Sequence, residues 1–139
     1  MNSRTLSIDW EDFGQLGGLY HGHGLTAPVG GAIERQTEII LDMLDEAGVK
    51  ATFFVLGVLA GDRPELVRII HKRGHEIGLH GHRHVLMSKL PREQAREDLK
   101  TSYKLVTDII GEKVHGYRAP FFSIDAANLH MLDAMAEIG

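Results

Sequence analysis

A cluster of histidines is the part of this sequence best suited to do chemistry. The segment "HGHRH" at 80–84 holds three of the nine histidines in the 139 residues. Residues four apart are about 13 Å apart in an extended strand, but their Cβ atoms come within about 5–6 Å in a helical or tight turn. Gly78 and Gly81 favour a bend here. We therefore predict that His80 and His84 form a metal-ligand pair and that His82 points elsewhere.

Carboxylates and an arginine could complete such a site. Asp9 and Asp12 follow a short β-type run, and Arg118 ends another. Two histidines and one carboxylate are the ligands of many hydrolytic zinc sites, which keep positions open for water and substrate. A second carboxylate can accept a proton from that water, and an arginine can orient it through a bidentate contact. The plainer alternatives are a surface histidine patch and a solvated acidic turn.

The hydrophobic pattern predicts the elements that would bring these groups together. We expect strands at 5–8, 50–57, 75–80 and 115–120. We expect helices at about 33–48, 62–74, 91–110 and 125–138, the last with Leu129, Leu132, Met135 and Ala136 facing inward. The glycine-rich segment 13–31 is expected to be a loop. Four β–α units indicate a parallel sheet with helices outside, and such folds place their chemistry at the carboxyl ends of the strands.

Composition narrows the class of protein. The length fits one domain, and 43% hydrophobic residues are enough for a core. The net charge of −4 gives no reason to expect a nucleic acid or an anionic membrane as partner. Cysteine is absent, so a metal would be held by His, Asp or Glu. The chain shows neither a signal-peptide pattern nor an apolar run of membrane-spanning length, so we expect a cytoplasmic protein.

Four segments together resemble a known family. They are "LSIDWEDF" (6–13), "ATFFVLG" (51–57), "GHEIGLHGHRH" (74–84) and "GYRAPFFSI" (116–124). In order and spacing they resemble the first three motifs of the polysaccharide deacetylases, the NodB-homology carbohydrate esterases. The details look most like the branch associated with exopolysaccharide and exosortase gene clusters. The resemblance implies a distorted (β/α) barrel. About four βα units of it would form one domain over 1–139, incomplete at the C-terminus, with an open sheet edge that a homo-oligomer could cover.

The resemblance also implies a reaction and a site. The reaction is the hydrolysis of N-acetyl, or sometimes O-acetyl, groups on a polysaccharide, with one divalent ion, commonly Zn²⁺. By position, it assigns Asp9 as the catalytic base, Arg118 as the residue that holds that base, Phe121 as a backbone donor to the oxyanion, and Asp12, His80 and His84 as metal ligands. Trp10 and Glu11 separate the usually adjacent aspartates here, so Glu11 competes with Asp12 as the ligand.

Other expectations follow from the same motifs. Trp10, Pro120 and Phe122 are expected to contact substrate, and Gly81 replaces the Ser or Thr that often follows the first histidine. The family's later motifs, which include a histidine general acid, are not found in these 139 residues. Two alternatives therefore stay open. One is a hydrolase of a C–N bond in a small cyclic amide or ureide, and the other is a non-catalytic metal- or glycan-binding remnant.

Overall fold

The computed structural model describes residues 5–12 and 32–138 and contains one parallel sheet. Its strands lie in the order β1 (Ser7–Trp10), β2 (Thr52–Val55), β3 (Glu76–Leu79) and β4 (Gly116–Tyr117). Each strand is parallel to its neighbour. The predicted α/β class with a parallel sheet is confirmed. The predicted loop at 13–31 lies outside the described residues.

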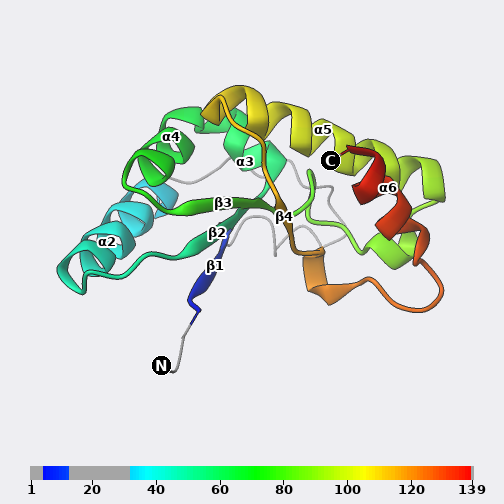
Figure 1. The fold of residues 1–139 in the computed structure, drawn as a ribbon, viewed down its shortest axis with the longest axis horizontal. Coiled ribbons are helices and arrows are strands. Elements are labelled where there is room, and N and C mark those ends of the chain that lie inside the picture. Colours follow the sequence, from blue (N-terminus) through cyan, green and yellow to red (C-terminus); the bar gives the residue numbers. More distant parts are fainter. Residues whose placement is uncertain (1–4, 13–31, 139) are drawn as a thin grey trace.

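Helices lie between the strands in the chain and arc along one side of the sheet (Figure 1). They are α2 (Ala32–Glu46), α3 (Gly57–Asp62), α4 (Pro64–Lys72), α5 (Arg92–Ile110) and α6 (His130–Ile138), with 3₁₀ turns η1 (Met87–Lys89) and η2 (Pro120–Phe122). The long helix α5 packs against α3, α4 and α6. None of the helices in the described parts of the chain is both long and apolar enough to cross a membrane.

The four strands end at the same level, and this alignment builds the site. Trp10 pairs with Val55, Val55 with Leu79, and Leu79 with Tyr117. The residue that follows each strand therefore lies on one rim of the sheet. Just beyond β3, the His80 N–H continues the ladder by donating to the Val55 carbonyl at 2.9 Å.

Two helices of the structure differ from the prediction. The short helix α3 was not predicted, because its sequence "GVLAGD" is too brief to show a helical period. The last helix begins at His130 rather than at 125. Asp125 and Asn128 explain the later start, because their side chains accept hydrogen bonds from the backbone N–H groups of Ala127 and Asp125. Such local bonds offer the backbone an alternative to the helix.

The inward face predicted for the last helix was wrong. Met131 and Ala134 are its buried residues, whereas Leu129 and Leu132 are more than half exposed. Of the other two residues predicted to face inward, Met135 is half-buried and Ala136 is exposed. Leu132 and Met135 line an open hollow of about 550 Å³ together with Phe54, Tyr117, Arg118, Ala119, Phe122 and Ile124.

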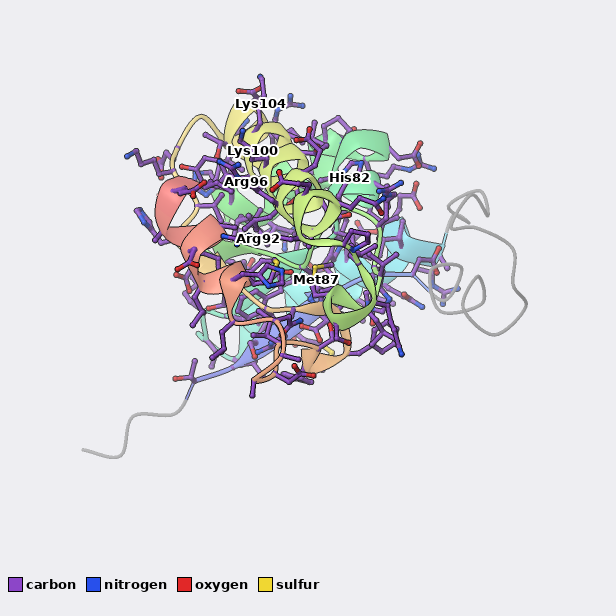
Figure 2. The ribbon with its side chains drawn as sticks, turned by 90° about the vertical axis from the view of Figure 1, so that its right-hand side faces the viewer. His82, Met87, Arg92, Arg96, Lys100 and Lys104 are labelled. Atoms are coloured by element: carbon purple, nitrogen blue, oxygen red, sulfur yellow. The ribbon has the colours of Figure 1, made fainter. Side chains whose placement is uncertain are left out.

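A row of basic side chains runs along α5, one every four residues: Arg92, Arg96, Lys100 and Lys104 (Figure 2). Acidic residues accompany most of this row. Arg92 lies 3.9 Å from Asp133 of α6, Arg96 pairs with Glu137 of the same helix, and Lys104 pairs with Asp108 at 2.6 Å. The row therefore joins α5 to α6 more than it forms a free basic surface, in agreement with the acidic net charge.

Candidate active site

One carboxylate and two histidines meet on the rim. One ligand atom from each of Glu11, His80 and His84 lies within 4.8 Å of the other two. Glu11 follows β1, and the two histidines follow β3. Ligand atoms on a single tetrahedral zinc ion are about 3.3 Å apart. A small movement of the three side chains toward one another would therefore bring their ligand atoms to this separation. The donor set therefore fits a divalent ion of the zinc type.

His80 is already oriented as a metal ligand. Its Nδ1 lies 2.8 Å from the backbone carbonyl oxygen of Arg118. A carbonyl oxygen only accepts, so Nδ1 must donate, and Nε2 keeps its lone pair for a metal. Burial lowers the pKa of His80 below its ordinary value, and this outweighs the opposing effects of the Arg118 carbonyl and Asp9. The ring is therefore neutral at pH 7, as a ligand must be.

Glu11 supplies the carboxylate of the group. Its Oε2 lies 2.8 Å from Nε2 of His84. This approach lacks hydrogen-bond geometry, and Oε2 is buried without a hydrogen-bond partner among the described residues. Burial by itself would raise the pKa of Glu11, but the contact with His84 and the nearby charges of His84 and His80 outweigh it, so the pKa lies below its ordinary value. Glu11 is thus ionised, with an oxygen available to a cation.

His84 takes its position from an unusual backbone conformation. Its φ of 48° lies in the left-handed region, which few non-glycine residues adopt. The bend brings its ring centroid to 5.1 Å from that of His80 and 4.5 Å from that of Phe121. Unlike His80, it has no acceptor for Nδ1 within the described parts of the chain.

Asp12 does not join the two histidines, although the resemblance favoured it over Glu11. It is buried, at 8% exposed, and lies outside the group that the structure brings together. The chain turns at this point, because β1 ends at Trp10 and the Glu11 N–H donates to the Asp9 carbonyl oxygen at 3.2 Å. Because Glu11 and Asp12 follow the strand, its period of two does not decide between them, and the sequence leaves the choice open.

Asp9 and Arg118 form the second polar pair of the rim. Nη1 of Arg118 donates to Asp9 Oδ1 at 2.6 Å, and Nη2 donates to Ser7 Oγ at 2.7 Å. The other oxygen of Asp9 lies 3.9 Å from His80 Nε2. Asp9 is therefore held by one oxygen while its second oxygen faces the metal-ligand group, as expected of a proton acceptor.

An aromatic ring supports Arg118. The guanidinium carbon lies 4.1 Å from the centre of the Phe54 ring, a distance at which a cation is attracted to the ring face. Room for this ring exists because position 78 is glycine. A Cβ on Gly78 would lie 2.6 Å from Phe54 Cδ1 and 3.3 Å from the carbonyl oxygen of Gly116. Gly78, Phe54 and Arg118 thus form a stack that ends at Asp9.

Strained backbone marks the turn η2 after β4. Phe121 and Phe122 have φ values of 56° and 51°. Non-glycine residues in this region store strain, which is concentrated at functional sites. The amides of Phe122 and Ser123 donate within the turn, to the carbonyls of Ala119 and Pro120. Among the described residues, no backbone bond is made by the Phe121 amide, which is consistent with its predicted role as an oxyanion donor.

The three residues expected at the substrate separate into two groups. Trp10 is only 3% exposed, and its indole N–H donates to Thr37 Oγ1 at 2.8 Å. Pro120 is also buried. Both residues are thus part of the interior, and a direct substrate contact has no support for either. Phe122 is 76% exposed and lies beside the hollow near Arg118, so it remains available to a substrate.

Comparison with protein families decides which group the chain belongs to. Residues 26–138 match the family model described as "Polysaccharide deacetylase". The chain belongs to the polysaccharide deacetylase family. This match covers most of the chain, including every described element after β1, and it confirms the family inferred from the motifs.

Two curated relatives are similar over somewhat less than two thirds of the chain. Chitin deacetylase 1 from Cryptococcus neoformans is 32% identical over 89 residues, which is 64% of this chain and 19% of the relative. Peptidoglycan-N-acetylglucosamine deacetylase from Bacillus cereus is 33% identical over 88 residues, which is 63% of this chain and 32% of the relative. The chain thus matches about a third of the length of these relatives, or less.

A solved structure supports the fold. A CE4 family pseudoenzyme from Bacillus anthracis superposes with a TM-score of 0.69 over 96% of this chain and 38% of its own length. Its sequence is 21% identical, so the likeness concerns the fold alone. The described sheet and helices are therefore similar in fold to this solved structure.

Proposed function

We propose that this chain carries the metal- and base-bearing part of a deacetylase that removes N-acetyl groups from a polysaccharide. The observation that carries the proposal is the convergence of Glu11, His80 and His84 with Asp9 on one rim. Hydrolysis of an amide needs an electrophilic catalyst and a proton acceptor next to each other. This rim has candidates for both.

A divalent ion, which we propose to be Zn²⁺, would be held by Glu11, His80 and His84. When bound, such an ion supplies Lewis acidity, which polarises the acetyl carbonyl and makes a water molecule a stronger acid. Glu11 is preferred to Asp12 because its oxygen lies among the histidine nitrogens. The neutral His80 ring and the ionised Glu11 carboxyl are the protonation states that such binding requires.

The chain's own residues perform the remaining steps. Asp9 accepts a proton from the attacking water, since its second oxygen faces the ligand group, and the same proton passes to the amine nitrogen when the C–N bond breaks. Arg118 keeps that carboxylate oriented through the 2.6 Å bond to its first oxygen. The Phe121 N–H donates to the oxygen that becomes negative as the carbonyl carbon turns tetrahedral. The exposed ring of Phe122 provides an apolar surface for a sugar ring.

The substrate class follows from what the relatives' names share. One is named for chitin and the other for the N-acetylglucosamine of peptidoglycan. Chitin is itself a polymer of N-acetylglucosamine, so we propose a glycan that contains N-acetylglucosamine as the substrate. The open form of the hollow beside Arg118 is compatible with a polymer lying across the rim.

The test is acetate release from acetylated chitooligosaccharides by the zinc-loaded chain. Asp9→Asn keeps the shape of the side chain but removes the proton acceptor, and it should lower kcat by about 10²–10⁴-fold. Asp108→Asn on α5 is the matched control, because Asp108 is an exposed residue whose one ion pair among the described residues is with Lys104. Equal rates for the two variants would contradict the role of Asp9.

A second panel separates this proposal from the alternatives. Small cyclic amides and ureides should not be hydrolysed by the zinc-loaded chain. Activity on these compounds with none on the oligosaccharides would show a C–N hydrolase of another substrate class. Oligosaccharide binding without acetate release would indicate a non-catalytic glycan-binding protein.

A further inference from the structure

Asp98 is a buried acid that the proposed chemistry does not use. It lies in the middle of α5 and is only 3% exposed. Aspartate is a poor helix former, and burying its charge is costly unless the charge is compensated. Oδ1 has no hydrogen-bond partner among the described residues and lies 3.7 Å from Nε of Arg83. The cost of burying this carboxylate must be offset by a contact, and the second oxygen of Asp98 makes one.

Asp98 Oδ2 accepts a hydrogen bond from the backbone N–H of His82 at 2.6 Å. His82 lies midway between His80 and His84, in the turn that follows β3. A bond from an N–H to a charged carboxylate is stronger than one between neutral groups. Asp98 therefore holds the centre of the segment that sets the separation of the two ligand histidines.

The helix α3 holds the same turn from another direction. The N–H groups of Gly57 and Val58 donate to the carbonyl oxygens of Gly81 and His82 at 2.9 and 3.0 Å. The His82 ring lies so close to Gly57 that a Cβ there would be 2.3 Å from Nδ1. In Figure 2, His82 lies level with Arg96 of α5, the helix that contains Asp98. The turn is thus fixed by two α3 amides and one α5 carboxylate.

The conformation of the turn explains why it needs these bonds. Gly81 has a φ of +77° and His84 a φ of 48°. A Cβ on Gly81 would lie 3.2 Å from Asp98 Oδ2, so the absence of a side chain lets the carboxylate approach. Glycine adopts the left-handed conformation at little cost, but His84 does not, so surrounding contacts must maintain the turn. Without Asp98, the His82 N–H would be left unpaired at the centre of this turn.

We propose that Asp98 is a positioning residue, which holds the turn at 81–83 so that His80 and His84 can bind one divalent ion. The inference rests on the proposed metal function of those histidines. It assigns Asp98 no contact with the ion or the substrate. Removing a residue that orients metal ligands without touching the ion typically weakens metal binding by about 10–100-fold.

The experiment measures the zinc dissociation constant of the wild-type chain, Asp98→Ala, Asp98→Asn and Val106→Ala. Val106 is a fully buried residue of the same helix, so its truncation weakens the fold without touching the turn. We expect Asp98→Ala to bind zinc about 10–100-fold more weakly than Val106→Ala at equal folded fraction. Asp98→Asn, which keeps an oxygen acceptor for the His82 N–H, should recover most of the loss. With Co²⁺ in place of zinc, the visible absorption spectrum should change in Asp98→Ala alone.

Hydrogen exchange gives a readout that needs no metal. The amide protons of His82 and His84 should exchange faster in Asp98→Ala than in Val106→Ala. Equal exchange rates, or equal zinc affinities, in these two variants would overturn the role of Asp98. A wild-type chain that binds no zinc would instead refute the proposed metal function, and the exchange rates would then decide the role of Asp98 in the turn.

Discussion

Replacing Gly78 by alanine should damage both the stability and the activity of the protein. A Cβ at this position would lie 2.6 and 2.7 Å from two atoms of the Phe54 ring. Carbon atoms prefer about 3.5–4.0 Å, so the ring must move by about 1 Å. On the other side the Gly116 carbonyl oxygen, 3.3 Å away, restricts movement of the strand. We expect the free energy of unfolding to fall by about 1–3 kcal/mol, as for other overpacked interiors.

The same displacement should reach the catalytic carboxylate. The Phe54 ring supports Arg118 at 4.1 Å, and Arg118 holds Asp9. A misplacement of about 1 Å can cost about 10²-fold in rate. We therefore expect Gly78→Ala to lower the rate of acetate release by about 10–100-fold under conditions where the chain is fully folded.

Urea unfolding and acetate release, measured together, test this reasoning. Gly61→Ala in α3 is the control, because its Cβ would meet only the flexible end of Leu105 at 3.3 Å, and alanine favours a helix. The double variant Gly78→Ala/Phe54→Leu should recover stability but not activity, since leucine leaves Arg118 without its ring. Gly78→Ala with the stability and activity of Gly61→Ala would refute the account of this stack.

Three further predictions concern single residues. Burial lowers the pKa of His75 below its ordinary value of 6.5. As the pH falls, His75 takes up a proton at a higher pH in the unfolded chain than in the folded chain, so the free energy of unfolding should decrease below about pH 6.5. Urea unfolding at several pH values should show a smaller decrease for His75→Gln, and equal decreases in the two proteins would contradict this cause. Arg118→Lys should lower kcat by about 10–100-fold with KM unchanged, because one ammonium cannot reproduce the planar fork that bonds Asp9 and Ser7 at once; a raised KM alone would indicate a substrate contact instead. Trp10→Phe removes the hydrogen bond to Thr37 and should lower the free energy of unfolding by about 0.5–1.5 kcal/mol, while kcat stays unchanged. A lower kcat in the folded variant would show that Trp10 does act in the substrate site.

The sequence was sufficient to predict the sheet and the convergence of its strand ends. Strand β2 is a continuous apolar run, and α5 is a long amphipathic helix that ends at Gly111, whose φ is +77°. Such strong periodic signals depend little on tertiary contacts. His80 and Arg118 could therefore be assigned to one rim from the order of the elements alone.

Features set by tertiary contacts could not be predicted in this way. The face that α6 buries depends on where the helix starts, and the side chains of Asp125 and Asn128 decide this. The choice between Glu11 and Asp12 depends on which side of the chain faces the histidines. That side depends on the turn after β1, and Trp10 in this turn is held by Thr37, which lies 27 residues away in the sequence.

Metal analysis of the purified chain tests the central claim most directly. The wild-type chain, Glu11→Gln and Asp12→Asn are loaded with Zn²⁺, freed of excess ion and measured by elemental analysis. The geometry of the rim predicts about one ion per chain in the wild type and in Asp12→Asn, and loss of the ion in Glu11→Gln. Retention by Glu11→Gln with loss in Asp12→Asn, or no zinc in any of the three, would contradict a centre built from Glu11, His80 and His84.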